Sequence, residues 1–247
     1  MATSTADSPD VTILVPAYNE ENTIREVVDR LLALPMNSEI IVVNDGSTDQ
    51  TGTHLAQYEG KIKVITHPKP GGKGNAIRSG LKHATGKTVI IQDADLEYFP
   101  EEMPTLINPI LEGKSEVVYG SRFTTGMHEG MALPNKIVNI LLRWTVMLLY
   151  GRKLTDEATC YKAFDRKLIQ GMELQCQRFE FCPEVTAKSI RLGKKIIEVP
   201  VRYEPRGKDA GKKIRWTDAP EAFWTLLKYR FWRPSSQPSA EPASSQD

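Results

Sequence analysis

The chain has 247 residues, of which 40% are hydrophobic and 26% are charged, and its formal net charge at pH 7 is +1. This is the composition of an ordinary globular domain, long enough to bury a sizeable core. A balance so close to neutral creates no global field that would attract nucleic acid, so we expect no nucleic-acid partner. An odd number of cysteines, three, without paired metal-ligand spacing argues against a disulfide framework and a zinc site. We expect reduced thiols in a cytoplasmic protein.

The two ends of the chain differ in composition from the part between them. Residues 1–9 are small and polar, and residues 234–247 are rich in Ser, Pro and Ala, so we expect both to be disordered. The first residues have neither a basic region nor an apolar segment, which argues against a signal peptide. No stretch is apolar over the roughly 20 residues that a bilayer requires. We therefore predict a single domain over residues 10–233.

Apolar strands alternate with helices over the first half of the chain. Runs rich in Val and Ile predict the strands, and apolar residues at helical spacing predict the helices between them. The strands are expected at 11–16, 39–43, 62–66, from Val89 and at 116–120, and the helices at about 24–32, 50–58, 75–84 and from Pro100. The first strand is expected to stop at Pro16. The alternation predicts an α/β fold with a mostly parallel sheet and helices on both faces.

An Asp-x-Asp pair, Asp93 and Asp95, follows the apolar run that begins at Val89. Open α/β sheets bind ligands at the carboxyl ends of their strands, where these acids would lie. On a regular strand, residues two apart face the same side. Paired carboxylates beside a phosphate ligand suit a hard cation such as Mg²⁺ or Mn²⁺. The alternative is a polar turn after a strand, which Asp often supplies.

A glycine-rich segment, Pro70–Gly74, precedes the helix expected from Asn75. Glycine lets a backbone come close to a ligand, and the N-terminus of a helix favours phosphate. The alternative is a flexible loop, because this segment is not a full P-loop pattern.

The second half of the chain has a different character. Pro134–Tyr150 is apolar but interrupted by polar residues, so it could lie in a membrane interface or be a helix of the core or of a dimer contact. Residues 154–164 are expected to be a polar loop entering an aromatic run. Residues 196–203 predict a strand, placed at the sheet edge by Pro200. An amphipathic helix is expected over about 220–231. Between these two lies a basic loop with Arg206, Lys208, Lys212, Lys213 and Arg215. The alternative to a binding role for this loop is that it is a solvated surface loop.

Four short motifs in this order and spacing resemble the inverting family 2 glycosyltransferases, which have the GT-A fold. They are Pro16-Ala17-Tyr18-Asn19-Glu20, Asn44-Asp45-Gly46-Ser47, Asp93-Ala94-Asp95 and Gly120-Ser121-Arg122. The resemblance covers about residues 10 to 233. Further segments are similar to the dolichol-phosphate mannose synthase branch, which includes bacterial polyprenyl-phosphate glycosyltransferases. These are Lys73-Gly74-Asn75-Ala76, Asp93–Glu97, Thr155-Asp156, Thr159-Cys160-Tyr161-Lys162 and Gly211-Lys212-Lys213-Ile214.

The resemblance implies roles for particular residues. A nucleoside pocket would be lined by Pro16, Tyr18 and Glu20, with Asp45 bonded to the base. The donor would also contact Lys73, Asp93 and Ala94. The metal, Mg²⁺ or Mn²⁺, would be held by Asp93, Asp95 and Glu97, where Glu97 replaces a Gln common in the mannose synthases. The acceptor or leaving phosphate would be held by Arg122 and by a basic group of the later loop, namely Arg206, Lys212 or Lys213.

The chemistry of transfer depends on the acceptor. Cleavage of a nucleotide sugar releases a nucleoside diphosphate, whose developing charge needs a cation and Arg or Lys. A polyprenyl phosphate is already anionic and needs no general base, whereas a sugar hydroxyl needs a carboxylate to take its proton. Asp156 and Glu157 are then the candidates, although Asp156 could instead be a helix cap or turn residue.

We therefore expect a glycosyltransferase that moves a hexose from a nucleotide sugar, of the GDP-mannose or UDP-glucose type, to dolichyl or undecaprenyl phosphate. Asp95, Arg122 and Asp156 are the expected catalytic residues. One alternative is an enzyme of the same fold that acts on a saccharide or small-molecule hydroxyl, and another is a non-catalytic nucleotide-sugar-binding module. Many relatives carry C-terminal membrane helices that this sequence lacks. We expect peripheral contact with the cytoplasmic membrane face through the 134–150 helix and the basic loop.

Overall fold

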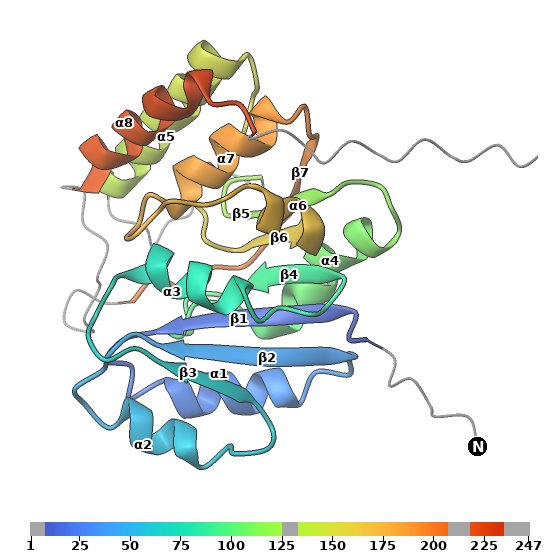
Figure 1. Cartoon of the computed structure of the whole chain (residues 1–247). Helices are drawn as coiled ribbons and strands as arrows, with labels where there is room; N and C mark the ends of the chain where they lie inside the picture. Colours follow the sequence, from blue (N-terminus) through green and yellow to red (C-terminus); the bar gives the residue numbers. More distant parts are fainter. Residues whose placement is uncertain (1–7, 125–132, 207–217, 235–247) are drawn as a thin grey trace, which may run out of the picture.

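The computed structural model describes residues 8–124, 133–206 and 218–234 (Figure 1). Most of the two ends for which the sequence predicts disorder therefore lies outside the described residues. The same holds for Lys208, Lys212, Lys213 and Arg215 of the basic loop.

The described residues form a seven-stranded sheet in the order β3-β2-β1-β4-β6-β5-β7. All neighbouring strands are parallel except for β6, which runs antiparallel to both β4 and β5. The strands are β1 (Val11–Ala17), β2 (Ser38–Asn44), β3 (Lys63–Thr66), β4 (Thr88–Ile91), β5 (Val117–Ser121), β6 (Lys162–Asp165) and β7 (Ile196–Pro200). The predicted α/β class is confirmed, and β7 lies at the sheet edge as Pro200 indicates.

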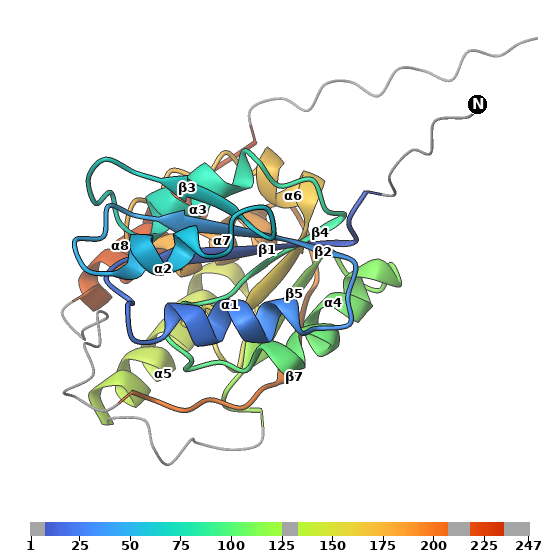
Figure 2. The same ribbon diagram turned by 90° about the horizontal axis from the view of Figure 1, so that it is seen from below.

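Helices cover both faces of the sheet. Figure 2 shows α1 and α4 on one face and α3 and α6 on the other. The helices are α1 (Ile24–Leu32), α2 (Thr51–Ala56), α3 (Lys73–Leu81), α4 (Met103–Leu111), α5 (Leu133–Tyr150), α6 (Arg166–Gly171), α7 (Phe181–Arg191) and α8 (Ala219–Lys228), with 3₁₀ turns η1 (Pro100–Glu102) and η3 (Tyr229–Phe231).

The core follows from the apolar spacing of the sequence. In α1, Ile24, Val27, Val28 and Leu31 recur at helical spacing, and each is at most 1% exposed. The β4 strand is buried along its whole length because helices cover both of its faces, as is usual for parallel strands.

Parallel pairing gathers the chain segments that carry the sequence motifs. The loops after β1, β2, β4 and β5 all leave the sheet at the same edge, since these strands run in the same direction. The order of the chain reverses between β1 and β4, because β1 leads outward to β2 on one side while β4 lies on the other. Ligands bind at such a switch point in open α/β sheets. Because β6 is antiparallel, the chain that enters it arrives at this same edge.

The first strand continues through Pro16 to Ala17, so the prediction that the proline stops it is wrong. Gln92 donates its N–H to the Leu14 carbonyl, and Pro16, two residues further along, faces the same side of β1. On that side β4 has already ended at Ile91. The missing N–H of the proline therefore costs no hydrogen bond between strands.

Two further expectations about strands are wrong. Residues 162–165 form β6, where the sequence suggested only the end of a loop. Asp93 and Asp95 do not share one face of a strand, because β4 ends at Ile91 and both acids lie in the turn that follows. The alternative, a polar turn after a strand, describes this backbone.

The helices α5 and α8 lie side by side at one end of the molecule (Figure 1). In α5 the buried residues are Asn139, Leu142 and Val146, so one narrow stripe of the helix meets the protein. Its opposite side exposes large apolar side chains, and an interpretation of α5 as a core helix is therefore wrong. No helix within the described ranges is long and apolar enough to cross a membrane.

A buried ion pair supports α7. Lys188 and Glu184 have side chains that are 0% exposed, and their charged atoms lie 2.7 Å apart. The Lys188 ammonium also donates to the carbonyls of Met172 and Glu173. The Glu184 carboxylate accepts the backbone N–H groups of Gln175 and Cys176. The hydrogen-bond partners of both charged groups are therefore backbone groups of the protein itself.

We predict that Lys188→Met lowers the free energy of unfolding by about 3–5 kcal/mol, because it leaves a buried carboxylate without its cation. Urea unfolding followed by tryptophan fluorescence measures this difference. The matched control is Lys194→Met, which breaks a partly exposed pair with Glu116 and should cost about 0–1 kcal/mol. Equal losses for the two variants would contradict the argument.

Candidate active site

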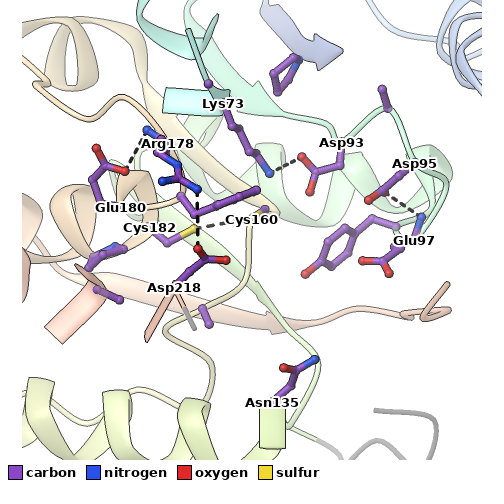
Figure 3. A pocket seen from close by; sticks show the side chains of 18 of the residues that line it. Lys73, Asp93, Asp95, Glu97, Asn135, Cys160, Arg178, Glu180, Cys182 and Asp218 are labelled. Atoms are coloured by element: carbon purple, nitrogen blue, oxygen red, sulfur yellow. Dashed lines mark hydrogen bonds and ion pairs between the residues drawn. The ribbon is translucent and has the colours of Figure 1, made fainter. Parts of the chain in front are cut away.

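A cavity of about 410 Å³ opens at the carboxyl edge of the sheet. Every site residue predicted from the sequence lines it, apart from Asp156 and the two lysines outside the described residues. They are Pro16, Tyr18, Glu20, Asp45, Lys73, Asp93, Ala94, Asp95, Glu97, Arg122 and Arg206. Figure 3 shows the acidic side of this cavity, with Lys73 reaching toward Asp93. The structure thus brings together residues that are nearly 200 positions apart in the sequence.

Asp45 holds the glycine-rich loop in place. Its carboxylate accepts the N–H of Gly71 at 3.0 Å and that of Gly72 at 2.7 Å. It also pairs with His67 Nδ1 at 2.6 Å, while His67 Nε2 lies 2.9 Å from the hydroxyl of Ser79. Asp45 is only 3% exposed, so this carboxylate acts as a structural anchor of the loop.

The N-terminus of α3 is engaged by the chain itself. Gly74 and Asn75 donate their N–H groups to the carbonyls of Arg178 and Gln177, each at 2.9 Å. Gly72 has a φ of 92°, and a Cβ atom there would lie 2.5 Å from the Gln177 carbonyl oxygen. Glycine is therefore required for close approach to another backbone segment. Both predictions for this segment are therefore wrong. The N–H groups of Gly74 and Asn75 are already bonded and are not available to phosphate. The loop is not flexible, because hydrogen bonds hold it at both ends.

Lys73 and Asp93 form an ion pair in the cavity wall, with each side chain 14% exposed. Burial acts to lower the pKa of the Lys73 ammonium, but the Asp93 carboxylate outweighs it and raises this pKa well above its ordinary value. Lys73 therefore remains a cation that faces the Asp-x-Asp turn.

Asp95 is the carboxyl group in this turn with a strongly shifted pKa. Burial, followed by the charges of Asp93 and Glu97, raises its pKa to about 7. Asp95 Oδ1 accepts the Glu97 N–H at 3.1 Å, and the intervening Leu96 has a φ of 60°. The turn thus concentrates negative charge around a partly buried group, an arrangement that a bound cation would stabilise.

Arg206 ties three parts of this acidic region together. Its guanidinium donates to Glu20 Oε2 at 2.7 Å and to the Asp95 carbonyl at 2.9 Å. Its backbone N–H donates to Glu97 Oε1 at 3.0 Å, and the Tyr203 hydroxyl donates to the other oxygen of Glu97 at 2.9 Å. Within the described ranges no three acidic, His or Cys side chains are grouped as a ready metal site. The carboxylates proposed as metal ligands have protein partners instead.

Arg122 and Asp156 form a second ion pair beside the cavity. Arg122 Nε and Nη2 donate to the two oxygens of Asp156 at 2.7 and 2.8 Å, and its backbone N–H adds a third bond at 3.1 Å. Burial acts to lower the pKa of Arg122, but Asp156 outweighs it and raises it well above its ordinary value. Asp156 is 0% exposed and does not line the cavity, and no helix follows it, so it is not a cap residue.

Glu157 is the neighbouring carboxyl group and has very different surroundings. It is 0% exposed yet lines the cavity, and its side-chain oxygens have no hydrogen-bond partner among the residues described. Burial raises its pKa, which favours the neutral acid. The two candidate bases therefore differ, because Asp156 is committed to Arg122, whereas Glu157 forms no ion pair within the described residues and has only the nearby charge of Lys162.

Several lining residues were not predicted from the sequence as site residues. Arg178 contributes its side chain and lies 3.8 Å from Asp218, which precedes α8. Cys160 and Cys182 face the cavity near Lys73, and apolar side chains of α5 and α8 complete the wall (Figure 3). Cys160 falls in a segment that supported the family resemblance, but the sequence gives no signal that these distant elements meet.

The comparisons with known proteins agree with the geometry. The family model described as glycosyl transferase family 2 matches residues 12–172, which is more than half of the chain. The chain belongs to this family. The match includes the loops after β1, β2, β4 and β5, and so it covers most of the acidic side of the cavity.

Two relatives are similar to this chain over most of its length. It is 30% identical over 211 residues to a dolichol-phosphate mannosyltransferase of Pyrococcus furiosus, which covers 82% of this chain and 58% of the relative. It is 31% identical over 213 residues to a UDP-N-acetylglucosamine–dolichyl-phosphate N-acetylglucosaminyltransferase of Methanococcus voltae, covering 77% and 84%. The chain thus spans little more than half of the first relative. These similarities agree with the predicted polyprenyl-phosphate branch.

A solved structure has the same fold. Glucosyl-3-phosphoglycerate synthase of Mycobacterium tuberculosis, crystallised with Mn²⁺, UDP-glucose and phosphoglyceric acid, superposes with a TM-score of 0.71. The alignment covers 92% of this chain and 82% of that one at 22% identity. The predicted GT-A fold is confirmed.

We predict that Asp45→Ala speeds amide hydrogen exchange at Gly71 and Gly72 by roughly ten- to hundredfold, because a hydrogen bond to a charged group contributes about 1.5–3 kcal/mol. Exchange followed by NMR measures this change. Asp49→Ala is the control, since Asp49 accepts the N–H groups of Thr51 and Glu21 instead. Unchanged exchange at both glycines in Asp45→Ala would refute the anchoring role.

Proposed function

We propose that this glycosyltransferase moves a hexose from a nucleotide sugar to a polyprenyl phosphate, with Mg²⁺ or Mn²⁺, and that residues 10–233 form its single catalytic domain. The names of both relatives support a lipid-phosphate acceptor. The observation that carries the proposal is the arrangement of charge in the cavity. The acidic turn at Asp93–Glu97 lies beside the cations Lys73 and Arg206.

The acidic turn fits a divalent cation. Three carboxyl groups, Asp93, Asp95 and Glu97, supply the oxygen ligands that Mg²⁺ and Mn²⁺ prefer. The raised pKa of Asp95 reports excess negative charge that a cation would neutralise. In this proposal Asp95 holds the cation, and Asp93 or Glu97 joins it after giving up a present partner. The cation would supply charge stabilisation at the donor diphosphate.

Protein cations hold the charge that develops on the leaving diphosphate. Lys73 is a permanent cation in the cavity wall, and Arg206 lies on the other side of the Asp95 turn. Positioned cations in a cavity of low dielectric stabilise a departing anion without having to reorganise. Asp45, Pro16, Tyr18 and Glu20 would then bind the nucleoside end of the donor.

The acceptor side supports an anionic acceptor. Arg122 is fixed by Asp156 and also lies over the ring of Tyr203, 5.0 Å from its centroid. A buried, oriented guanidinium suits a phosphate. Both oxygens of Asp156 accept hydrogen bonds from Arg122. In this proposal Asp156 therefore positions this cation and does not act as a base. A phosphate oxygen attacks without giving up a proton, and no base is then needed.

The test of the function is nucleotide release by purified protein with Mn²⁺ or Mg²⁺. We predict acceptor-dependent release from one of UDP-glucose, UDP-N-acetylglucosamine or GDP-mannose when a short-chain polyprenyl phosphate is present. Asp95→Asn should lower turnover roughly 100-fold or more, because it weakens the hold on the cation that would stabilise the charge of the departing diphosphate. Full turnover of Asp95→Asn would refute the proposed donor site. Absence of release with every donor and lipid phosphate would refute the function.

A hydroxyl acceptor is the second candidate, and the unpaired Glu157 is the observation that favours it. A general base with a raised pKa is suited to proton transfer near neutral pH. With a phosphate acceptor, Glu157→Gln should keep turnover within about tenfold. With a hydroxyl acceptor it should lose roughly 100-fold or more. The same variant therefore decides between the two acceptor classes.

We further propose that the exposed face of α5 and α8 rests on the cytoplasmic face of the membrane that carries the acceptor. We call it the apolar face, and it includes Phe231 of the turn η3 that follows α8. Its residues on the two helices are Leu133, Ile137, Ile140, Leu141, Trp144, Met147, Leu148, Trp224 and Leu227. Trp144, Leu148 and Phe231 are 70%, 85% and 78% exposed. Basic residues, including Lys136, Lys228 and Arg230, lie on the same helices and the turn after α8. Apolar side chains beside basic ones suit an anionic lipid interface.

We predict that the wild-type chain sediments with vesicles of anionic lipid and that Trp144→Glu combined with Leu148→Glu weakens this binding roughly tenfold or more. Leu111→Glu is the control, because Leu111 is a 44% exposed leucine on α4, away from the apolar face. A wild-type dimer that these two substitutions dissociate, with no binding to vesicles, would instead identify a contact between copies.

A further inference from the structure

Two of the three cysteines face each other in the cavity wall. The Sγ atoms of Cys160 and Cys182 lie 3.8 Å apart, although the residues belong to different elements. Cys160 lies in the segment that enters β6, and Cys182 lies in the first turn of α7. Both line the cavity beside Lys73 and Asp93 (Figure 3). The site described so far gives this thiol pair no role.

The two thiols have unequal surroundings. The Cys182 Sγ also lies 3.2 Å from the Thr159 carbonyl oxygen, to which it can donate. The hydrogen bond with Cys182 lowers the pKa of Cys160 to about 7, and the charge of Lys73 acts in the same direction. The hydrogen bond with Cys160 and burial raise the pKa of Cys182. Cys160 is therefore the more nucleophilic member at neutral pH, because the thiolate is the reactive form.

The third cysteine provides an internal contrast. Cys176 is 2% exposed and does not line the cavity. Burial, followed by the neighbouring Glu184, raises the pKa of its thiol. It has neither a second thiol beside it nor a path from the cavity, so it should remain unreactive under conditions that oxidise the pair.

We infer that Cys160 and Cys182 form an oxidisable thiol pair in the cavity wall, which a small peroxide entering the cavity converts to a reversible disulfide. The sulfur atoms are in contact but not bonded, and a disulfide would shorten their separation from 3.8 Å to about 2.05 Å. The cavity gives a small oxidant access to groups that are otherwise buried.

The reaction balances with peroxide as the only added reagent. The Cys160 thiolate attacks one peroxide oxygen, the O–O bond breaks, and the leaving hydroxide takes up a proton to become water. Cys160 is now a sulfenic acid. The Cys182 sulfur then attacks the Cys160 sulfur, the S–O bond breaks, and the second hydroxide leaves as water with the Cys182 proton. The pair loses two electrons, and the peroxide gains them.

The disulfide would join the segment before β6 to the start of α7. Lys73, whose charge lies beside the reduced pair, lines the same cavity as both cysteines. The effect on sugar transfer rests on the proposed function, whereas formation of the cross-link does not. The chemical product and the loss of turnover can therefore be measured separately.

The experiment treats the full chain with hydrogen peroxide, blocks the remaining thiols with N-ethylmaleimide and maps the peptides by mass spectrometry. We expect loss of two thiols per chain, a cross-linked peptide containing Cys160 and Cys182, and a Cys176 that carries N-ethylmaleimide because it was not oxidised. Dithiothreitol should restore both thiols. Nucleotide release should fall in step with cross-linking and recover with it.

Variants separate this pair from general oxidation. Cys160→Ser and Cys182→Ser should each abolish the cross-link, and Cys176→Ser should leave it unchanged. Oxidation of Cys160 and Cys182 to separate sulfinic acids, or equal reactivity of Cys176, would overturn the inference, and the wild-type chain alone can reveal either outcome. A chain that forms the cross-link but shows no transfer with any donor would refute the proposed function and leave the thiol pair established.

Discussion

The shared direction of the strands is the constraint on which the site depends. Because β1, β2, β4 and β5 are parallel in direction, the loops that carry the sequence motifs leave the sheet at one edge. The antiparallel β6 brings the segment with Asp156, Glu157 and Cys160 to that edge from the opposite direction. The strand directions therefore determine which segments meet at the cavity. The ion pairs then fix the side chains in its walls.

Much of the fold can be predicted from the sequence, since buried strands and amphipathic helices have distinct periods. The apolar runs of β1, β2 and β4 and the spacing of α1 are of this kind. The short β6 could not be predicted in this way. It contains Lys162, which is 0% exposed because its ammonium lies 3.4 Å from the centroid of the Tyr119 ring and donates to the Glu157 carbonyl. A buried charge that packs against a ring as far away in the chain as Tyr119 has no signature in the local sequence.

The candidate site, like the fold, can be predicted only in part from the sequence. The motifs predict that Asp45, Asp95 and Arg122 meet, because each follows a predicted strand. They do not predict the partners of these residues. Asp45 binds the glycine loop, and the start of α3 is held by carbonyls of residues 177 and 178, about a hundred positions further along. These contacts depend on packing between helices and loops, which no short-range pattern records.

The ion pairs of the cavity also have a thermodynamic consequence. Lys73 is bound to Asp93, and Arg206 is bound to Glu20 across the Asp95 turn. A divalent cation alone would bind the carboxylates and leave the basic groups without partners. A diphosphate alone would bind the basic groups and leave the carboxylates without partners. When the two bind together, the cation can pair with the carboxylates while the diphosphate pairs with the basic groups. Each ligand would then raise the affinity for the other by the same factor, so heterotropic cooperativity is inherent in this pairing.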